Sequence, residues 1–291
     1  GPRDPQPGRV PAVERPRRVQ SGLGLGGHLG LGHIGRVAHD DVHAALEVGA
    51  RDKGITLSQV DPARVRVIHN GIDVERWRPV QDPAFLSSIG MDPDRPSVVF
   101  VGRITRQKGL PYLLQAARLL PPEVQLILCA GAPDTPEIMA EVQEGVRLLQ
   151  QTREGVVWIE RMLPRDELSA ILAAATTFVC PSVYEPLGIV NLEAMACGAA
   201  VVGTATGGIP EVVDDGVTGR LVPIEQVQDG TGTPTDPDRF VADLAAVLTE
   251  VATDPARARE YGEAGRERAR TQFSWGAIAD ETRALYAELS A

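Results

Sequence analysis

This sequence predicts a doubly wound α/β domain built on a parallel sheet, and two observations support that fold class. From about residue 97 onward, short runs of consecutive apolar residues alternate with longer segments whose apolar residues recur at helical spacing. Strands that are apolar along their whole length are covered on both faces, and strands that alternate with helices form parallel sheets. The ligand of such a sheet lies at the carboxyl ends of its strands.

The order of the elements follows from the same alternation. Strands are expected over residues 97–102, 124–131, 156–160, 176–182, 199–204 and 219–223. Helices are expected over about 110–119, from about Thr135, at Pro164, from about Gly188, near Pro210 and from about Asp236 to the end. An earlier short strand is expected in RVRVIHNGID, running into a turn at Asn70-Gly71. We therefore expect one folded domain over residues 61–291.

Residues 1–60 are expected to form an irregular or truncated N-terminal remnant. The first 54 residues hold 11 of the 30 glycines and four of the five histidines. The glycine patterns that begin at Gly22 and Gly30 fit G-x-G-x-x-G, but the first follows no buried strand, as a dinucleotide-binding motif must. A nicotinamide-dependent oxidoreductase is therefore disfavoured. His39 and His43 have the spacing of two metal ligands on a helix, but no third ligand is suggested.

Composition narrows the class of partner. The formal net charge is −10 and the isoelectric point is about 5.1, which disfavours binding to a nucleic-acid backbone. No apolar run reaches the length of a membrane span, and the first residues do not resemble a signal peptide. The three cysteines lie in apolar segments and are expected to be buried and reduced, which fits a cytoplasmic location.

The first candidate site follows the strand at 97–102 directly. Gly102 allows the backbone to approach a ligand closely. Arg103 offers a planar guanidinium and Lys108 a compact ammonium, a combination suited to a diphosphate. The chain has only two lysines, Lys53 and Lys108, against 27 arginines, that is 29 basic residues minus two. The retained lysine favours a specific role over that of an ordinary surface cation in a solvated loop.

The second candidate site follows the strand at 176–182. A proline after Glu185 keeps that residue out of the helix, which begins near Leu187 and Gly188. The free amides and the positive dipole end of that helix face the edge of the sheet. Glu193 lies further along the same helix among apolar neighbours, so we expect a carboxylate with a specific partner there rather than a helix-surface charge.

The third candidate site follows the strand at 199–204. Gly207 and Gly208 precede Pro210, which is placed to begin a helix. Unpaired amides at a glycine-rich helix start can bind an anion. An ordinary turn between a strand and a helix is the alternative at this position.

Together the three sites resemble a known family in order and spacing. The loop G-R-x4-K-G, the pair E-x7-E formed by Glu185 and Glu193, and the turn T-G-G-x-P-E resemble the retaining GT-B glycosyltransferases of the glycogen-synthase and sucrose-synthase class, family 4. The resemblance covers about residues 61–290 and is strongest to bacterial glycogen synthases that use ADP-glucose, including those that make α-maltose 1-phosphate. It implies that the chain carries the Rossmann-like C-terminal, donor-binding domain of a GT-B fold.

The resemblance implies a role for each candidate residue. Arg103 and Lys108 would neutralise the diphosphate leaving group, and Glu185 would hold hydroxyls of the transferred glucose. Glu193 would bind the ribose. The implied donor-binding residues are Gly102, Leu187, Gly188, Ile189, Glu193, Gly207 and Gly208.

The same resemblance implies glucosyl transfer from ADP-glucose, as substrate, to an α-glucan or glucose 1-phosphate. No metal or other cofactor is expected, since Arg103 and Lys108 would supply the positive charge. The two D-x-D patterns, at Asp92 and at Asp236, both look like turns rather than metal ligands.

The resemblance is incomplete at the N-terminus. A GT-B enzyme has a preceding Rossmann domain that binds the acceptor, and residues 1–60 are too short to be that domain. Two alternatives therefore stay open: an isolated nucleotide-sugar-binding domain that is inactive alone, and a family 4 transferase that uses a UDP- or GDP-sugar. The final helices normally reach across the missing domain, so we expect their apolar face to be exposed.

Overall fold

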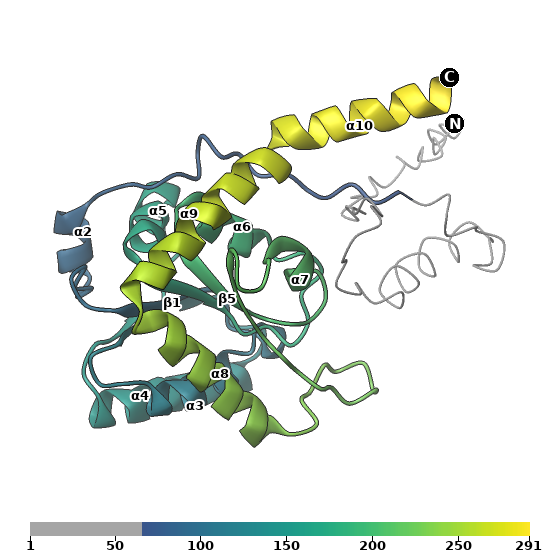
Figure 1. The fold of residues 1–291 in the computed structure, drawn as a ribbon. Coiled ribbons are helices and arrows are strands. Elements are labelled where there is room, and N and C mark those ends of the chain that lie inside the picture. Colours follow the sequence, from purple (N-terminus) through teal and green to yellow (C-terminus); the bar gives the residue numbers. More distant parts are fainter. Residues whose placement is uncertain (1–65) are drawn as a thin grey trace, which may run out of the picture.

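The computed structural model describes residues 66–291 of the chain, which form the α/β body shown in Figure 1. The predictions made for residues 1–60, including the two glycine patterns and the histidines His39 and His43, lie outside the described residues.

A six-stranded parallel sheet forms the centre of the domain, as predicted. Its strands are β1 Ser97–Arg103, β2 Gln125–Gly131, β3 Val156–Ile159, β4 Thr177–Cys180, β5 Ala200–Thr204 and β6 Gly219–Val222. Their spatial order is β3-β2-β1-β4-β5-β6, and every neighbouring pair is parallel. The order reverses between β1 and β4, so the loops after these two strands lie side by side at the topological switch point.

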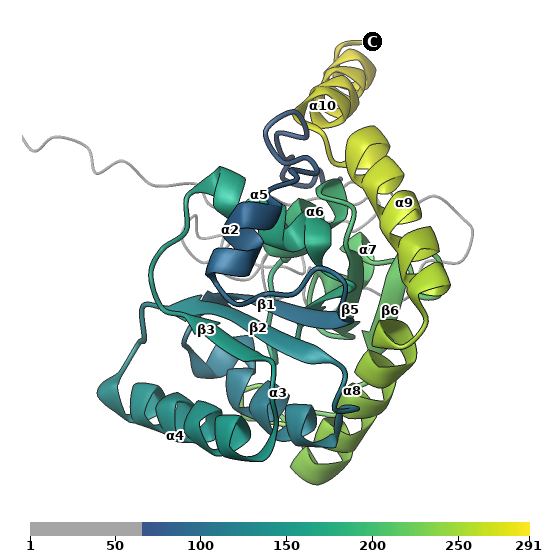
Figure 2. The same cartoon turned by 90° about the vertical axis from the view of Figure 1, so that its left-hand side faces the viewer.

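Helices cover both faces of the sheet (Figures 1 and 2). The helices are α2 Pro83–Ser88, α3 Leu110–Ala116, α4 Pro136–Thr152, α5 Arg165–Ala174, α6 Ile189–Ala196, α7 Ile209–Val212, α8 Pro237–Ala252, α9 Pro255–Gln272 and α10 Trp275–Ser290. One buried cluster lies between the sheet and α3, α4 and α8, and a second lies between the sheet and α5, α6 and α7. These two cores account for the continuous apolar strands in the sequence.

Short polar side chains begin four of the longer helices. Thr135, Asp236, Asp254 and Ser274 each accept a hydrogen bond from the amide three residues further on. Such caps satisfy amides that have no partner inside the helix. The helix expected from about Asp236 is confirmed, whereas the interpretation of the D-x-D pattern there as a turn was wrong, because this carboxylate and the proline after it begin α8. At the other D-x-D pattern, Asp92 accepts from the amide of Asp94 within a turn.

Two segments near the start of the described chain differ from the prediction. The strand expected in RVRVIHNGID does not join the sheet; Ile72 instead makes an isolated bridge to Ser274, between α9 and α10. The amide of Ile72 donates to the carbonyl of Phe273 at 2.8 Å. Helix α2 was missed because its six residues are too few for a helical pattern, although Asp82 and Pro83 carry the start signal.

Helix α10 projects from the body and exposes apolar side chains, as expected (Figure 1). Trp275, Tyr286 and Leu289 are 55%, 64% and 76% exposed, and Ile278 is the buried residue of this helix. Within residues 66–291, none of the helices combines the length and the apolar character needed to cross a membrane.

Candidate functional site

The loop after β1 fixes the direction of Lys108. Residues Arg106–Lys108 form one 3-10 turn, and the hydroxyl of Thr105 accepts from the amide of Lys108 at 3.2 Å. Gly109 then takes a left-handed conformation, with φ of 65°. A Cβ at this position would lie 1.8 Å from the carbonyl oxygen of Pro181. Only glycine therefore allows the loop after β1 to approach the loop after β4 this closely.

Gln107 joins the same two loops. Its carbonyl accepts from the amide of Val183 at 2.9 Å, and its side-chain amide donates to the carbonyl of Tyr184 at 2.8 Å. The sequence predicted no role for Gln107 or Gly109, because both act through contacts to residues more than 70 positions away. Together they bring Lys108 next to the segment that carries Glu185.

Lys108 and Glu185 form a largely buried ion pair. The ammonium nitrogen of Lys108 lies 2.5 Å from Oε2 of Glu185, and their side chains are 21% and 9% exposed. The hydroxyl of Ser182 donates to the same oxygen at 3.1 Å. The residue predicted to contact a diphosphate and the residue predicted to contact a sugar are thus in direct contact. A bound nucleotide sugar has its reacting bond between just these two groups.

The amides at the start of α6 have no acceptor among the described residues, which agrees with the free amides expected from the sequence. Gly188 precedes the helix with φ of 80°, and Ile189, 41% exposed, is its first residue. In the described part of the chain, no group accepts a hydrogen bond from the amides of Leu187, Gly188 or Ile189. Three unpaired donors at a helix N-terminus beside Glu185 can bind the oxygen atoms of a phosphate or a sugar.

The Gly207-Gly208 turn packs directly against Glu185. The amide of Gly208 donates to the carbonyl of Glu185 at 2.8 Å, so this donor holds the turn in place. The amide of Gly207 has no acceptor among the described residues. Gly207 has φ of 52°, and a Cβ there would lie 2.1 Å from the carbonyl oxygen of Glu185. The turn therefore sets the position of Glu185 from the side of β5.

Gly207→Ala should lower stability more than Gly216→Ala. Both glycines have positive φ, but a Cβ at Gly216 meets no atom within 4 Å. Gly216→Ala should cost about 1–2 kcal/mol, the backbone penalty alone. Gly207→Ala adds the clash with Glu185 and should cost several times as much. Urea denaturation of the two variants measures the difference, and equal losses would contradict the close contact.

Arg103 lies at the end of β1 and points to solvent. Its guanidinium is 2.9 Å from Oδ1 of Asp134, and the two side chains are 63% and 49% exposed. An exposed pair of this kind is weak, about 0–1 kcal/mol, so Arg103 can exchange Asp134 for a phosphate at little cost. Gly102, beside it, packs on the stem of Lys108: a Cβ there would lie 3.8 Å from Cγ of Lys108.

Glu193 is separate from the Lys108–Glu185 pair. It lies on α6, and none of the described residues forms a hydrogen bond or ion pair with its carboxylate. Burial raises the pKa of Glu193 to about 7, and the more distant Arg165 partly opposes the shift. This is the half-buried carboxylate expected from its apolar neighbours, but the partner expected for it is not among the described residues.

The raised pKa of Glu193 predicts that stability falls as pH rises. The folded protein holds the Glu193 proton up to about pH 7, whereas the unfolded chain releases it near pH 4.5. The contribution of Glu193 to stability is therefore fully present below pH 4.5, declines across this window and is level above about pH 7. Glu193→Gln should remove roughly 1–3 kcal/mol of this decline. Urea denaturation at about pH 5 and about pH 8 measures it, with the exposed Glu263→Gln as control. A decline that survives in Glu193→Gln would contradict the assignment.

The three cysteines are buried, as predicted. Cys129, Cys180 and Cys197 are free thiols, and burial raises the pKa of each. The pKa of Cys129 reaches about 12. A protonated, buried thiol is a small apolar side chain rather than a nucleophile.

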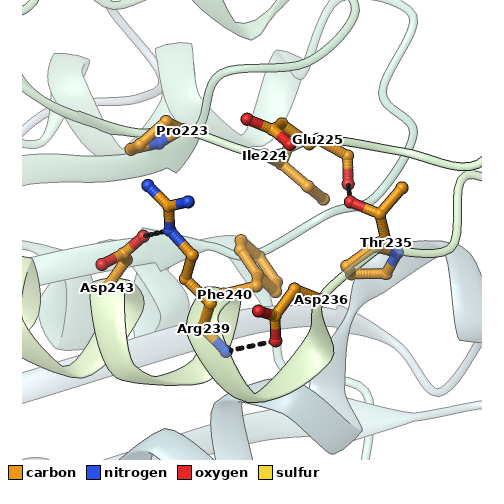
Figure 3. A pocket seen from close by; sticks show the side chains of 9 residues that line it. Pro223, Ile224, Glu225, Thr235, Asp236, Arg239, Phe240 and Asp243 are labelled. Atoms are coloured by element: carbon orange, nitrogen blue, oxygen red, sulfur yellow. Dashed lines mark hydrogen bonds and ion pairs between the residues drawn. The ribbon is translucent and has the colours of Figure 1, made fainter.

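A hollow lies beyond the end of β6, between the loop after that strand and α8 (Figure 3). Its walls include Ile224, Phe240 and Arg239, and the Arg239 guanidinium lies 3.7 Å from Asp243 one turn further along α8. None of the site residues expected from the sequence lines this hollow.

The comparisons with known proteins give the family of the chain. Residues 95–250 match the family described as glycosyl transferases group 1, so the chain belongs to that family. The match covers the loop after β1, the start of α6 and the Gly207-Gly208 turn. Membership of this family argues against the nicotinamide-dependent oxidoreductase considered in the sequence analysis.

Two relatives show which members of this family the chain resembles in sequence. The chain is 51% identical to the alpha-maltose-1-phosphate synthase of Mycolicibacterium smegmatis, over 86% of this chain and 64% of that protein. It is 37% identical to a D-inositol 3-phosphate glycosyltransferase of Mycolicibacterium vanbaalenii, over 80% of this chain and 49% of that protein. The chain thus spans less than two thirds of the length of these relatives.

Solved structures show the same fold. Sucrose-phosphate synthase from Thermosynechococcus elongatus matches with a TM-score of 0.63 and 31% identity, over 86% of this chain and 56% of that one. The Anabaena protein HepE, in complex with UDP-glucose, matches with a TM-score of 0.64 and 21% identity, over 84% and 62%. The domain architecture is therefore that of the GT-B transferases.

Proposed function

We propose that this chain transfers glucose, with retention of configuration, from ADP-glucose to an α-glucan or to glucose 1-phosphate. The observation that carries the proposal is the contact between Lys108 and Glu185, close in the chain to the unpaired amides at the start of α6. A cation for the diphosphate and a carboxylate for the sugar meet where the glycosidic bond of the donor would lie. The 51% identity to alpha-maltose-1-phosphate synthase supports a sugar transferase, and the choice of ADP-glucose rests on the resemblance to bacterial glycogen synthases.

In the proposed reaction the bond between C1 of glucose and the diphosphate oxygen breaks, and a bond from C1 to the acceptor oxygen forms on the same face. The acceptor proton passes to the departing phosphate oxygen. Lys108 and Arg103 stabilise the charge that grows on the diphosphate. Glu185 accepts hydrogen bonds from glucose hydroxyls, and Glu193 accepts from the ribose. A metal-free reaction and a cytoplasmic location stay predictions.

The main alternative is a nucleotide-sugar-binding domain that needs a further domain to act. It is favoured by the share of the relatives that this chain spans, 64% of the first and 59% of the second. In that case the chain binds the donor without transferring its sugar. A transferase that uses a UDP- or GDP-sugar is the other alternative. The acceptor could also differ, since D-inositol 3-phosphate glycosyltransferases are among the relatives.

A transfer assay with a panel of donors separates these functions. ADP-, UDP- and GDP-glucose are each incubated with glucose 1-phosphate or an α-glucan, nucleotide release is measured, and NMR reports the anomeric configuration of the product. We expect release with ADP-glucose and an α-linked product. Donor binding without release would favour the isolated binding domain, and release from UDP- or GDP-glucose alone would overturn the choice of donor.

A further inference from the structure

Asn191 is a buried polar side chain that the proposed function leaves unexplained. It lies in the first turn of α6 and is 0% exposed. In the part of the chain that the structure describes, neither its side-chain nitrogen nor its oxygen has a hydrogen-bond partner. Buried amides are nearly always paired, since an unpaired one destabilises the fold. Because an unpaired amide does not stabilise the fold, Asn191 is a candidate for a functional role.

The Asn191 amide points toward Gly188, where it lies near the side chain of Glu185. A Cβ built on Gly188 would lie 2.3 Å from Nδ2 of Asn191, 3.5 Å from its Cγ and 3.2 Å from Cγ of Glu185. The amide nitrogen is thus the part of Asn191 nearest to Gly188, and the Glu185 side chain borders the same point. The missing side chain at Gly188 leaves these two groups adjacent.

Glu185 has an oxygen that can accept from this amide. Oε2 accepts from Lys108 and from Ser182, whereas no described residue donates to Oε1. The proposed function requires Lys108 to turn toward the diphosphate, which takes one donor from Oε2. Glu185 is 7% exposed, so water replaces that donor poorly. A nearby amide donor would replace the lost contact and fix the direction of the carboxylate.

We propose that Asn191 is a positioning residue of the sugar subsite. When the donor draws Lys108 toward its diphosphate, the amide of Asn191 donates to the Glu185 carboxylate and holds it toward the glucose hydroxyls. Asn191 is fully buried and does not itself touch the sugar, so it acts through Glu185. The inference rests on the proposed function and adds to it a residue that controls the affinity for the glucose part of the donor.

Asn191→Leu tests this role, because leucine has a similar branched shape but no donor. Calorimetric titration with ADP and with ADP-glucose measures both affinities, and thermal unfolding measures stability. We expect an ADP affinity within about twofold of the unmodified chain, and an ADP-glucose affinity lower by about tenfold, the effect of one charge-assisted hydrogen bond. The melting temperature should rise, since an unpaired amide is replaced by an apolar side chain.

Ser169→Ala is the matched control. Ser169 is equally buried on α5, beside Cys197 at the opposite end of α6, and its removal should leave the ratio of the two affinities unchanged. If leucine is too large for the site and the variant does not fold, Asn191→Ala gives the same comparison. An unchanged ratio in a folded Asn191 variant would overturn the inference, and so would equal losses for ADP and ADP-glucose. If the unmodified chain binds neither nucleotide, both the proposed function and this inference are contradicted.

Discussion

Lys108→Ala should weaken ADP binding roughly ten- to hundredfold. A hydrogen bond to a charged group contributes about 1.5–3 kcal/mol, and Lys108 contacts Glu185, which shortly precedes the unpaired amides of α6 in the chain. The variant should also be less stable, because Glu185 keeps the hydroxyl of Ser182 but loses its counter-charge. Calorimetry measures the affinity, and thermal unfolding measures the stability.

Arg106→Ala is the control for Lys108→Ala. Both residues lie in the same 3-10 turn, but Arg106 is 72% exposed and pairs with Glu141 at 3.0 Å. Its removal should leave ADP affinity within about twofold, as expected for an exposed ion pair away from the site. Equal ADP affinities in Lys108→Ala and the unmodified chain would refute the diphosphate assignment.

Glu185→Gln should reduce glucosyl transfer by about 10²–10³, the loss typical of removing one preorganised electrostatic contact from an active site. The amide keeps the shape of the carboxylate but accepts weakly from sugar hydroxyls. ADP affinity should stay close to that of the unmodified chain, because glutamine leaves Lys108 free to contact the diphosphate. Nucleotide release in the presence of acceptor measures transfer, and calorimetry measures ADP affinity.

Glu160→Gln is the control for Glu185→Gln. Glu160 is exposed and follows β3 at the same edge of the sheet, so its neutralisation changes the charge of that edge without touching the pair. Transfer should be unaffected. If Glu185→Gln lost transfer and ADP affinity in equal measure, Glu185 would be acting on the nucleotide rather than on the sugar.

The sheet could be predicted from the sequence because its signals are local. Five of the six strands contain a run of at least three consecutive apolar residues, the exception being β6 with Arg220, and each predicted strand overlaps the observed one. The helix starts at Thr135 and Gly188 were also visible, since a capping residue or a glycine marks each of them. The strand expected before Asn70 was wrong because that segment pairs with the junction of α9 and α10, which no local pattern reveals.

The site could be predicted only in part. Residue type and position after a strand were enough to select Lys108 and Glu185, but not their contact, which depends on Gly109 and Gln107 bringing two distant loops together. The raised pKa of Glu193 depends on how deeply α6 is packed, which its apolar neighbours only suggested. The unpaired amide of Asn191 has no signal in the sequence, because an asparagine on a helix is ordinarily exposed.

The central claim is that the edge of the sheet at Lys108 and Glu185 binds a nucleotide sugar, and calorimetric titration of this chain with ADP-glucose, ADP and UDP-glucose tests it most directly. The account predicts binding of ADP-glucose that is tighter than binding of ADP or UDP-glucose, and that is weakened by Lys108→Ala but not by Arg106→Ala. A chain that circular dichroism shows to be folded, and that binds none of the three, would contradict it.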